Sequence, residues 1–115
     1  MKLVIAVIQP QKLNAVREAL ERIDVTRLSV CDSFGYARQR GHTEMYRGLE
    51  YESNLLRKIV VEIAVNDDFL EPTIACLTEI ARTGSEGAIG DGKIFVLPMD
   101  HAIRIGETVT GPGAI

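Results

Sequence analysis

A glycine-rich stretch near the C-terminus could bind phosphate. Residues 84–95 are GSEGAIGDGKIF, and the seven residues from Gly87 to Lys93 have the spacing of a P-loop. In a P-loop, backbone N–H groups and the lysine contact the phosphates, and the next residue is a Ser or Thr that reaches Mg²⁺. Here the next residue is Ile94, which has no hydroxyl. The stretch is therefore a candidate phosphate site without the magnesium ligand of a P-loop.

The elements around this stretch have the wrong order for a P-loop. A P-loop follows a strand and opens a helix, so the positive end of the helix dipole faces the phosphates. Here the pattern predicts a helix that ends near Thr83 and a strand that begins near Lys93. The helix end beside the glycines then carries partial negative charge, which repels phosphate. Two interpretations remain equal: a nucleotide cradle of a different design, with charge supplied by Lys93, Arg104 and Arg38, or a tight structural turn.

No cluster of metal-ligating or nucleophilic residues stands out elsewhere. Cys31 and Cys76 lie far apart and lack metal-type spacing, so we expect both to be buried with free thiols. His42 and His101 are isolated as well, and surface positions are expected for both. The sequence thus predicts neither a metal centre nor a catalytic site.

The elements that must position the glycine-rich stretch follow from the apolar periodicity. Residues 2–9 and 58–65 are short runs rich in Val and Ile, typical of buried strands. A second extended segment covers residues 25–34, and KIFVL supplies a fourth strand at residues 93–97. Apolar residues at spacings of three and four predict two helices, with stripes at Leu13, Val16, Leu20 and Ile23 and at Leu70, Ile74, Leu77, Ile80 and Ala81. Because Pro72 is tolerated only near a helix start, the second helix is expected to begin past Asp68.

The order strand, helix, strand, repeated once, predicts an α+β fold: a ferredoxin-like βαββαβ sandwich. Two helices would cover one face of a four-stranded antiparallel sheet. The other face would leave Val and Ile side chains in water, so we expect a closed homo-oligomer. Between the halves, residues 36–57 show no sustained period and carry charges and tyrosines, Tyr46 and Tyr51 among them. This long connection is expected to be a binding loop rather than a linker.

Composition limits the class of protein. The chain has 115 residues, 46% of them hydrophobic and 25% charged, which is typical of one globular domain. A formal net charge of −3 gives no general affinity for nucleic acid. The apolar runs are too short for a signal peptide or membrane insertion, so a cytoplasmic location is expected. We expect one domain over residues 1–107 and a flexible tail over residues 108–115.

Three segments resemble the P-II nitrogen-regulatory signal proteins. ARTG at residues 81–84 with IGDGKIFVL at 89–97 looks like the family's C-terminal signature. RQRGHTEMYRGLEY at residues 38–51 looks like its long effector loop, and residues 1–12 with VREAL at 16–20 look like its opening strand and helix. The match extends to about Glu107, and three ordered motifs make it specific.

The resemblance implies a homotrimer that binds ATP or ADP in clefts between subunits and is not an enzyme. Together with Mg-ATP, 2-oxoglutarate would report carbon and nitrogen status. Carried over position by position, the nucleotide-binding residues would be Ser29, Gly35, Arg38, Gln39, Glu62, Ala64, Gly90, Gly92, Lys93 and Arg104. Gln39 would also complete the Mg²⁺ shell, and Gln39, Gly41 and Lys58 would bind 2-oxoglutarate.

The resemblance also assigns roles in the long loop. Tyr51 matches a tyrosine that many relatives carry as a uridylylation or adenylylation site, which implies a nucleotidyltransferase as a partner. Arg47 matches the arginine that relatives insert into an ammonium transporter. An ammonium transporter, or an enzyme or regulator of nitrogen metabolism, is therefore the implied target, although Tyr and Arg are also common in ordinary interfaces.

The chain departs from the family pattern near the phosphate site. Ser85–Ala88 replaces a single lysine, a net insertion of three residues that creates the P-loop spacing, and Glu86 is expected to place a negative charge near the phosphates. A second arginine expected after Arg104 is missing, which should weaken discrimination between ATP and ADP. Arg57 replaces a proline before Lys58.

Two other functions stay open beside the nitrogen sensor. The first keeps adenine nucleotide but replaces 2-oxoglutarate by another small anion such as bicarbonate. The second is an RNA-binding domain of the same topology, which is less favoured because the strands at residues 2–9 and 58–65 contain no aromatic residue on which a base could stack.

Overall fold

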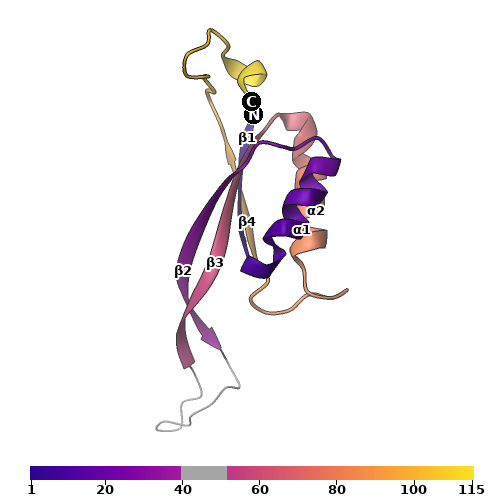
Figure 1. The fold of residues 1–115 in the computed structure, drawn as a ribbon, viewed down its shortest axis with the longest axis vertical. Coiled ribbons are helices and arrows are strands. Elements are labelled where there is room, and N and C mark those ends of the chain that lie inside the picture. The colour runs from indigo at the N-terminus through magenta and orange to yellow at the C-terminus, as the bar shows by residue number, and fades with distance from the viewer. Residues whose placement is uncertain (40–51) are drawn as a thin grey trace.

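The computed structural model describes residues 1–39 and 52–115. A four-stranded antiparallel sheet, in the order β2-β3-β1-β4, has both α-helices on one face (Figure 1). The ferredoxin-like α+β fold predicted from the sequence is therefore confirmed. Its elements are β1 Lys2–Ile8, the 3₁₀ helix η1 Pro10–Lys12, α1 Leu13–Arg22, β2 Ser29–Gln39, β3 Glu52–Val65, α2 Asp67–Ala81, β4 Gly92–Pro98 and the 3₁₀ helix η2 Gly111–Ala114.

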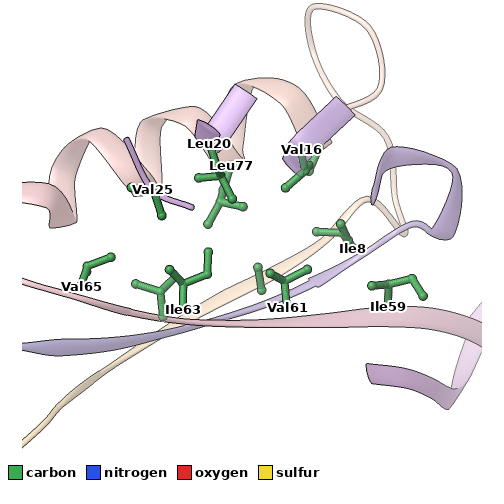
Figure 2. Packing of buried hydrophobic residues seen from close by; sticks show 12 residues of the cluster. Ile8, Val16, Leu20, Val25, Ile59, Val61, Ile63, Val65 and Leu77 are labelled. Atoms are coloured by element: carbon green, nitrogen blue, oxygen red, sulfur yellow. The ribbon is translucent and has the colours of Figure 1, made fainter. Parts of the chain in front are cut away.

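The core lies between the helices and the two central strands, as Figure 2 shows. Every second residue of β1 from Val4 and of β3 from Ile59 is buried there because side chains alternate across a strand. The helices contribute the residues of their apolar stripes, which recur at three- and four-residue spacings. The main contributors are Val4, Ala6 and Ile8 of β1, Ile59, Val61, Ile63 and Val65 of β3, Val16 and Leu20 of α1, and Leu77 of α2.

The opposite face of the sheet is apolar and open. Ile5 pairs with Phe95, and Leu3 pairs with Leu97, on the side away from the helices. Phe95 is 50% exposed and Leu97 is 43% exposed. No part of the chain within residues 1–39 and 52–115 covers this face, which we call the open sheet face (Figure 1). The expectation that another subunit covers it is consistent with this arrangement.

Strands β2 and β3 extend further than the sequence indicated. The expected loop over residues 36–57 is partly a two-stranded ribbon, since pairing continues to Gln39 opposite Glu52. The sequence of this ribbon is mostly polar and shows no apolar alternation from which its strands could be predicted. Near its base, Arg57 donates to Asp32 from both Nε and Nη2, at 3.0 and 2.8 Å. An ion pair therefore stands where the family pattern has a proline.

Helix α2 begins at Asp67, earlier than expected, and keeps Pro72 in its interior. Asp67 and Asp68 in the first turn favour this start because they face the positive end of the helix dipole. The N-terminal ammonium of Met1 lies 2.8 Å from Asp67 Oδ1. Its hydrogen bond, and the one from Lys2, lower the pKa of Asp67. These contacts fix the start of the helix against the beginning of β1.

The cysteines and histidines fall only partly where expected. Cys31 is exposed on edge strand β2, so the prediction that both cysteines are buried is wrong for it. Cys76 is partly buried, and this desolvation raises the pKa of its thiol. Both thiols are free. His101 is exposed as predicted, and His42 lies outside the described residues.

The C-terminal segment folds back on the chain. Ile103 forms a β-bridge with Thr110, and the N–H of Gly111 donates to the carbonyl of Ala102 at 2.8 Å. The Asn66 side-chain amide donates to the Pro112 carbonyl at 3.0 Å. Residues 108–115, expected as a flexible tail, thus have defined contacts here, and their flexibility stays a prediction. None of the helices within residues 1–39 and 52–115 has the length and apolar character needed to cross a membrane.

Candidate phosphate site on the open sheet face

Five of the predicted site residues line one cavity. It has a volume of about 290 Å³ and lies where the end of β1 meets the middle of β3 and the start of β4. We call it the sheet-face cavity, because Lys58 and Lys93 lie on the open side of the sheet. The predicted residues that line it are Gly35, Lys58, Gly90, Gly92 and Lys93, together with Val7 and Leu56.

The carbonyl of Gly90 brings two side chains to the mouth of this cavity. It accepts hydrogen bonds from Lys58 Nζ at 2.6 Å and from Gln9 Nε2 at 2.8 Å. The ammonium of Lys58 has further donors, so it can bind an anion while it stays next to the turn. With Lys93 on the same cavity wall, two positive charges converge on a space of ligand size.

Asp91 stabilises the glycine-rich turn through hydrogen bonds to its own carboxylate. Its carboxylate accepts from the N–H of Thr83 at 2.9 Å, from the Thr83 hydroxyl at 2.5 Å and from the N–H of Ala88 at 2.8 Å. The Thr83 hydroxyl, followed by the two backbone donors, lowers the pKa of Asp91 from 3.8 to about 2. The carboxylate is therefore ionised at neutral pH, and its hydrogen bonds join the end of α2 to the turn. We call these contacts the Asp91 clamp.

Gly92 must be glycine for β4 to pair with β1. Its φ is +130°, and a Cβ at this position would lie 1.8 Å from the carbonyl oxygen of Val7. Gly90 has φ of +94° and lines the cavity, so it also requires glycine. The glycines of the signature thus serve both the turn and the close approach of two strands.

Three predicted base-framing residues lie further along the sheet. Ser29 is paired with Glu62 across β2 and β3, and Ala64 follows on the same face. Glu62 is exposed on the open sheet face. None of the three lines the sheet-face cavity.

Arg104 follows the end of β4 at Pro98, whereas the glycine-rich turn precedes the start of β4 at Gly92. Its Nε donates to the Ala114 carbonyl at 3.3 Å, and its Nη1 lies 3.3 Å from Glu107 Oε2. Arg104 and Lys93 of the same chain therefore do not lie together in one site. The C-terminal segment holds Arg104 instead.

The remaining predicted residues belong to the long loop. Arg38 and Gln39 are the last residues of β2, and the roles predicted for their side chains fall outside what the structure describes. Gly41, Arg47 and Tyr51 lie outside the described residues altogether. Their assignments stay predictions.

Four residues of the cavity and its turn were not predicted from the sequence: Val7, Gln9, Leu56 and Asp91. Gln9 and Val7 carry no signal of their own, because only the pairing of β1 with β4 brings them to the turn. Asp91 was detectable in principle, since a short acidic residue between glycines commonly accepts backbone N–H bonds within its own turn.

The inserted residues line a different cavity. Glu86, Gly87 and Ala88 border a larger space on the helix side of the sheet, which we call the helix-side cavity. The expectation that Glu86 adds negative charge beside the phosphates is not met in the sheet-face cavity, whose lining excludes it. The insertion therefore adds no residue to the lining of the candidate phosphate site.

Comparisons with known proteins point to one family. The family model described as nitrogen regulatory protein P-II matches residues 1–108. Nitrogen regulatory protein GlnK1 of Methanosarcina mazei is 54% identical over 115 residues, which covers 100% of this chain and 97% of that protein. Nitrogen regulatory protein P-II 1 of Escherichia coli K12 is 47% identical over 105 residues, covering 91% of each chain.

A solved structure shows the same fold. The structure of B. subtilis GlnK superposes with a TM-score of 0.78 and 32% sequence identity, and the match covers 99% of this chain and 97% of that chain. A trimer is typical of such proteins. The sequence signatures, the ferredoxin-like fold and these similarities lead to one conclusion: the chain belongs to the P-II nitrogen regulatory protein family.

Proposed function

We propose that this chain is a homotrimeric, non-enzymatic sensor that binds ATP or ADP between subunits and regulates a target through its long loop. P-II proteins are regulatory signalling proteins with partners in nitrogen control, which supports a role of this kind in the cytoplasm. The proposal includes 2-oxoglutarate, bound with Mg-ATP, as the effector.

One observation carries the proposal: the phosphate-binding cations are divided between the two ends of the sheet. Lys93 is the second residue of β4, and Arg104 lies six residues beyond the end of β4 at Pro98. The five residue steps from Lys93 to Pro98, at a rise of roughly 3.4 Å per residue, separate the two ends of the strand by about 17 Å. A single phosphate chain can therefore meet both only if the arginine comes from a neighbouring subunit.

The open sheet face supports such a neighbour. Exposed apolar residues, among them Phe95 and Leu97, occupy the face on which the sheet-face cavity opens. Covering them stabilises the assembly by about 25 cal/mol for each Å² of apolar surface removed from water. A closed trimer covers three equal faces and completes three nucleotide sites at once.

Each residue has a physical role in this site. Backbone N–H groups of Gly90 and Gly92 and the charge of Lys93 would bind phosphate oxygens. A Cβ in place of the Gly35 hydrogen would meet no atom within 4 Å, so this position leaves room beside the nucleotide. Ser29, Glu62 and Ala64 would frame the base from the neighbouring part of the sheet. Lys58 would pair with a carboxylate of 2-oxoglutarate, beside Gly41 and a Mg²⁺ held by Gln39 and the ligands' oxygens.

The long loop would carry the output. Ligand binding at Lys58, at the base of the ribbon, gives the loop an electrostatic reason to change its conformation. Arg47 would then contact an ammonium transporter or another target of nitrogen metabolism. Addition of a nucleotidyl group to Tyr51 would block that contact by its bulk and charge.

Isothermal titration calorimetry tests the nucleotide site. We expect Lys93→Met to weaken ATP binding by about 10- to 100-fold, the usual effect of losing one charge-assisted contact. Arg17→Met, on the exposed side of α1, is the matched control and should bind as the wild type does. Equal affinity in the two variants would contradict the assigned site.

The effector is identified by a second titration. With Mg-ATP present, we expect saturable heat from 2-oxoglutarate, and Lys58→Met should abolish it while ATP binding survives. Titration with bicarbonate is the alternative arm, because an ammonium group binds any small anion. Heat from bicarbonate alone would replace 2-oxoglutarate by that effector and keep the nucleotide site.

A further inference from the structure

The helix-side cavity has no role in the function proposed above. Its volume is about 520 Å³, which is within the usual range for small-molecule sites. The floor is apolar and consists of core residues at this end of the sheet and of α2. These are Ile8 and Ile94 of the sheet with Leu77 and Ala81 of α2.

This cavity lies on the other side of the sheet from the proposed nucleotide site. Thr78 and Leu77 of α2 line it, whereas the sheet-face cavity has no lining residue from either helix. The two cavities share only Val7, Gly92 and Lys93, the residues at which β1 and β4 meet. A molecule could therefore occupy one without filling the other.

The insertion forms part of the wall. Glu86, Gly87 and Ala88 line the cavity, and Ile89 continues the wall towards the turn. The Asp91 clamp holds the N–H of Ala88 at 2.8 Å and so fixes this segment relative to the end of α2. Because the extra residues form the wall, a shorter turn would leave the core residues as an open surface.

Arg82 supplies a polar contact. It lines the cavity, and its Nε is buried without a hydrogen-bond acceptor among the described residues. A buried donor without an acceptor is unfavourable, and a ligand oxygen would satisfy it. Charges in the lining balance, since Arg82 and Lys93 face Glu86 and Asp91. The lining therefore has no net preference for an ion.

From these observations we propose that the helix-side cavity binds a small, mainly apolar, uncharged molecule with one hydrogen-bond acceptor. The apolar body would cover the floor formed by Leu77, Ala81 and Ile94. Its acceptor atom would accept a hydrogen bond from the side-chain Nε–H of Arg82. Because the ligand would contact Gly92 and Lys93 from behind, its binding would act on the same turn as the nucleotide.

Acetophenone is a suitable probe, since it is a phenyl ring with one ketone acceptor and no charge. Titration of the ¹⁵N-labelled protein, without nucleotide, should give saturable amide shifts at Thr78, Arg82 and Gly87 with a Kd on the order of 1 mM, ordinary for a ligand of this size. Ethylbenzene has the same shape without the acceptor and should bind about tenfold more weakly. Omitting nucleotide makes this result independent of the ATP site.

Two variants on α2 form a matched pair. Thr78→Trp places an indole in the cavity, whereas Ala75→Trp places one on the exposed surface of the same helix, outside the lining. We expect the first to weaken acetophenone binding by at least about tenfold and the second to leave it unchanged. Arg82→Met should bind acetophenone about as weakly as the wild type binds ethylbenzene, because the hydrogen bond to the ketone is lost. The absence of saturable shifts in the wild type, or equal binding by the two tryptophan variants, would overturn the proposal.

Discussion

The substitution Gly92→Ala tests how the turn is joined to the sheet. The new Cβ would lie 1.8 Å from the Val7 carbonyl oxygen and 2.9 Å from its carbon, and both atoms are backbone. Neither can turn aside as a flexible side chain can. The start of β4 must therefore move away from β1, or the Ile8 and Gly92 pairing must open.

The expected loss of stability has two parts. An L-residue at φ of +130° costs about 1–3 kcal/mol in backbone strain. Forcing an extra carbon into a packed position costs about another 1–3 kcal/mol. The free energy of unfolding should fall by about 2–6 kcal/mol, a large part of the roughly 5–15 kcal/mol of an ordinary domain.

Gly84→Ala is the matched control. Gly84 also has a positive φ, +63°, but nothing lies within 4 Å of the position that its Cβ would take. Gly84→Ala should therefore lower the free energy of unfolding only by the backbone strain, about 1–2 kcal/mol. Urea unfolding at one fixed protein concentration measures the difference, because assembly makes stability depend on concentration. If both variants lose the same free energy, the close contact with Val7 is not what requires glycine at residue 92.

Three further predictions concern single contacts. The folded pKa of Asp91, about 2, lies below its ordinary 3.8, so the stabilisation from the Asp91 clamp should be complete above about pH 4 and lost as the pH falls towards 2. In an NMR pH titration of the folded protein, the amide shifts of Thr83 and Ala88 should change with a midpoint near pH 2. A midpoint near pH 3.8 would contradict the clamp. Glu107→Gln should release Arg104 from its ion pair and tighten ATP binding about two- to fivefold in calorimetry, since the exposed pair contributes about 1 kcal/mol or less; unchanged affinity would mean that the pair does not compete with phosphate. Leu77→Ala should lower the free energy of unfolding by about 2–5 kcal/mol in urea, because its side chain is fully buried, whereas a loss below 1 kcal/mol would place Leu77 outside the core.

The core of the fold was predictable because its periodicities are strong. Alternation in β1 and β3 and the three- and four-residue spacing in the helices locate Val4, Val61 and Leu20 in one core from the sequence alone. The start of α2 was mispredicted, because the rule against interior proline outweighed the two acidic residues of the first turn. The β2-β3 ribbon was missed because residues 36–39 and 52–57 show no apolar alternation in the sequence. In both places the local sequence signal was weaker than the contacts made by the folded chain.

The candidate site was predictable only in part, for a similar reason. The turn residues Gly90, Gly92 and Lys93 stand together in the sequence, and the family motif identifies them. Lys58 comes from another strand, and only the antiparallel pairing shows that it bonds to the Gly90 carbonyl. Tertiary structure also determines that Cys31 is exposed and that the C-terminal segment binds Arg104. Neither feature could be predicted from the local sequence.

The glycine-rich stretch shows why spacing alone misidentifies a phosphate site. Its P-loop spacing results from the inserted residues, yet Glu86, Gly87 and Ala88 line the helix-side cavity and not the sheet-face cavity. In the proposed function, the phosphate-binding part of the stretch would begin only at Gly90, where the carbonyl orients Lys58 and the next glycine allows β4 to approach β1. Since the end of α2 beside the turn carries partial negative charge, the proposed site would take its positive charge from side chains of the sheet and of a neighbouring subunit. Such a site depends on assembly, and binding of nucleotide should therefore stabilise the oligomer, whereas a true P-loop would bind nucleotide within a single chain.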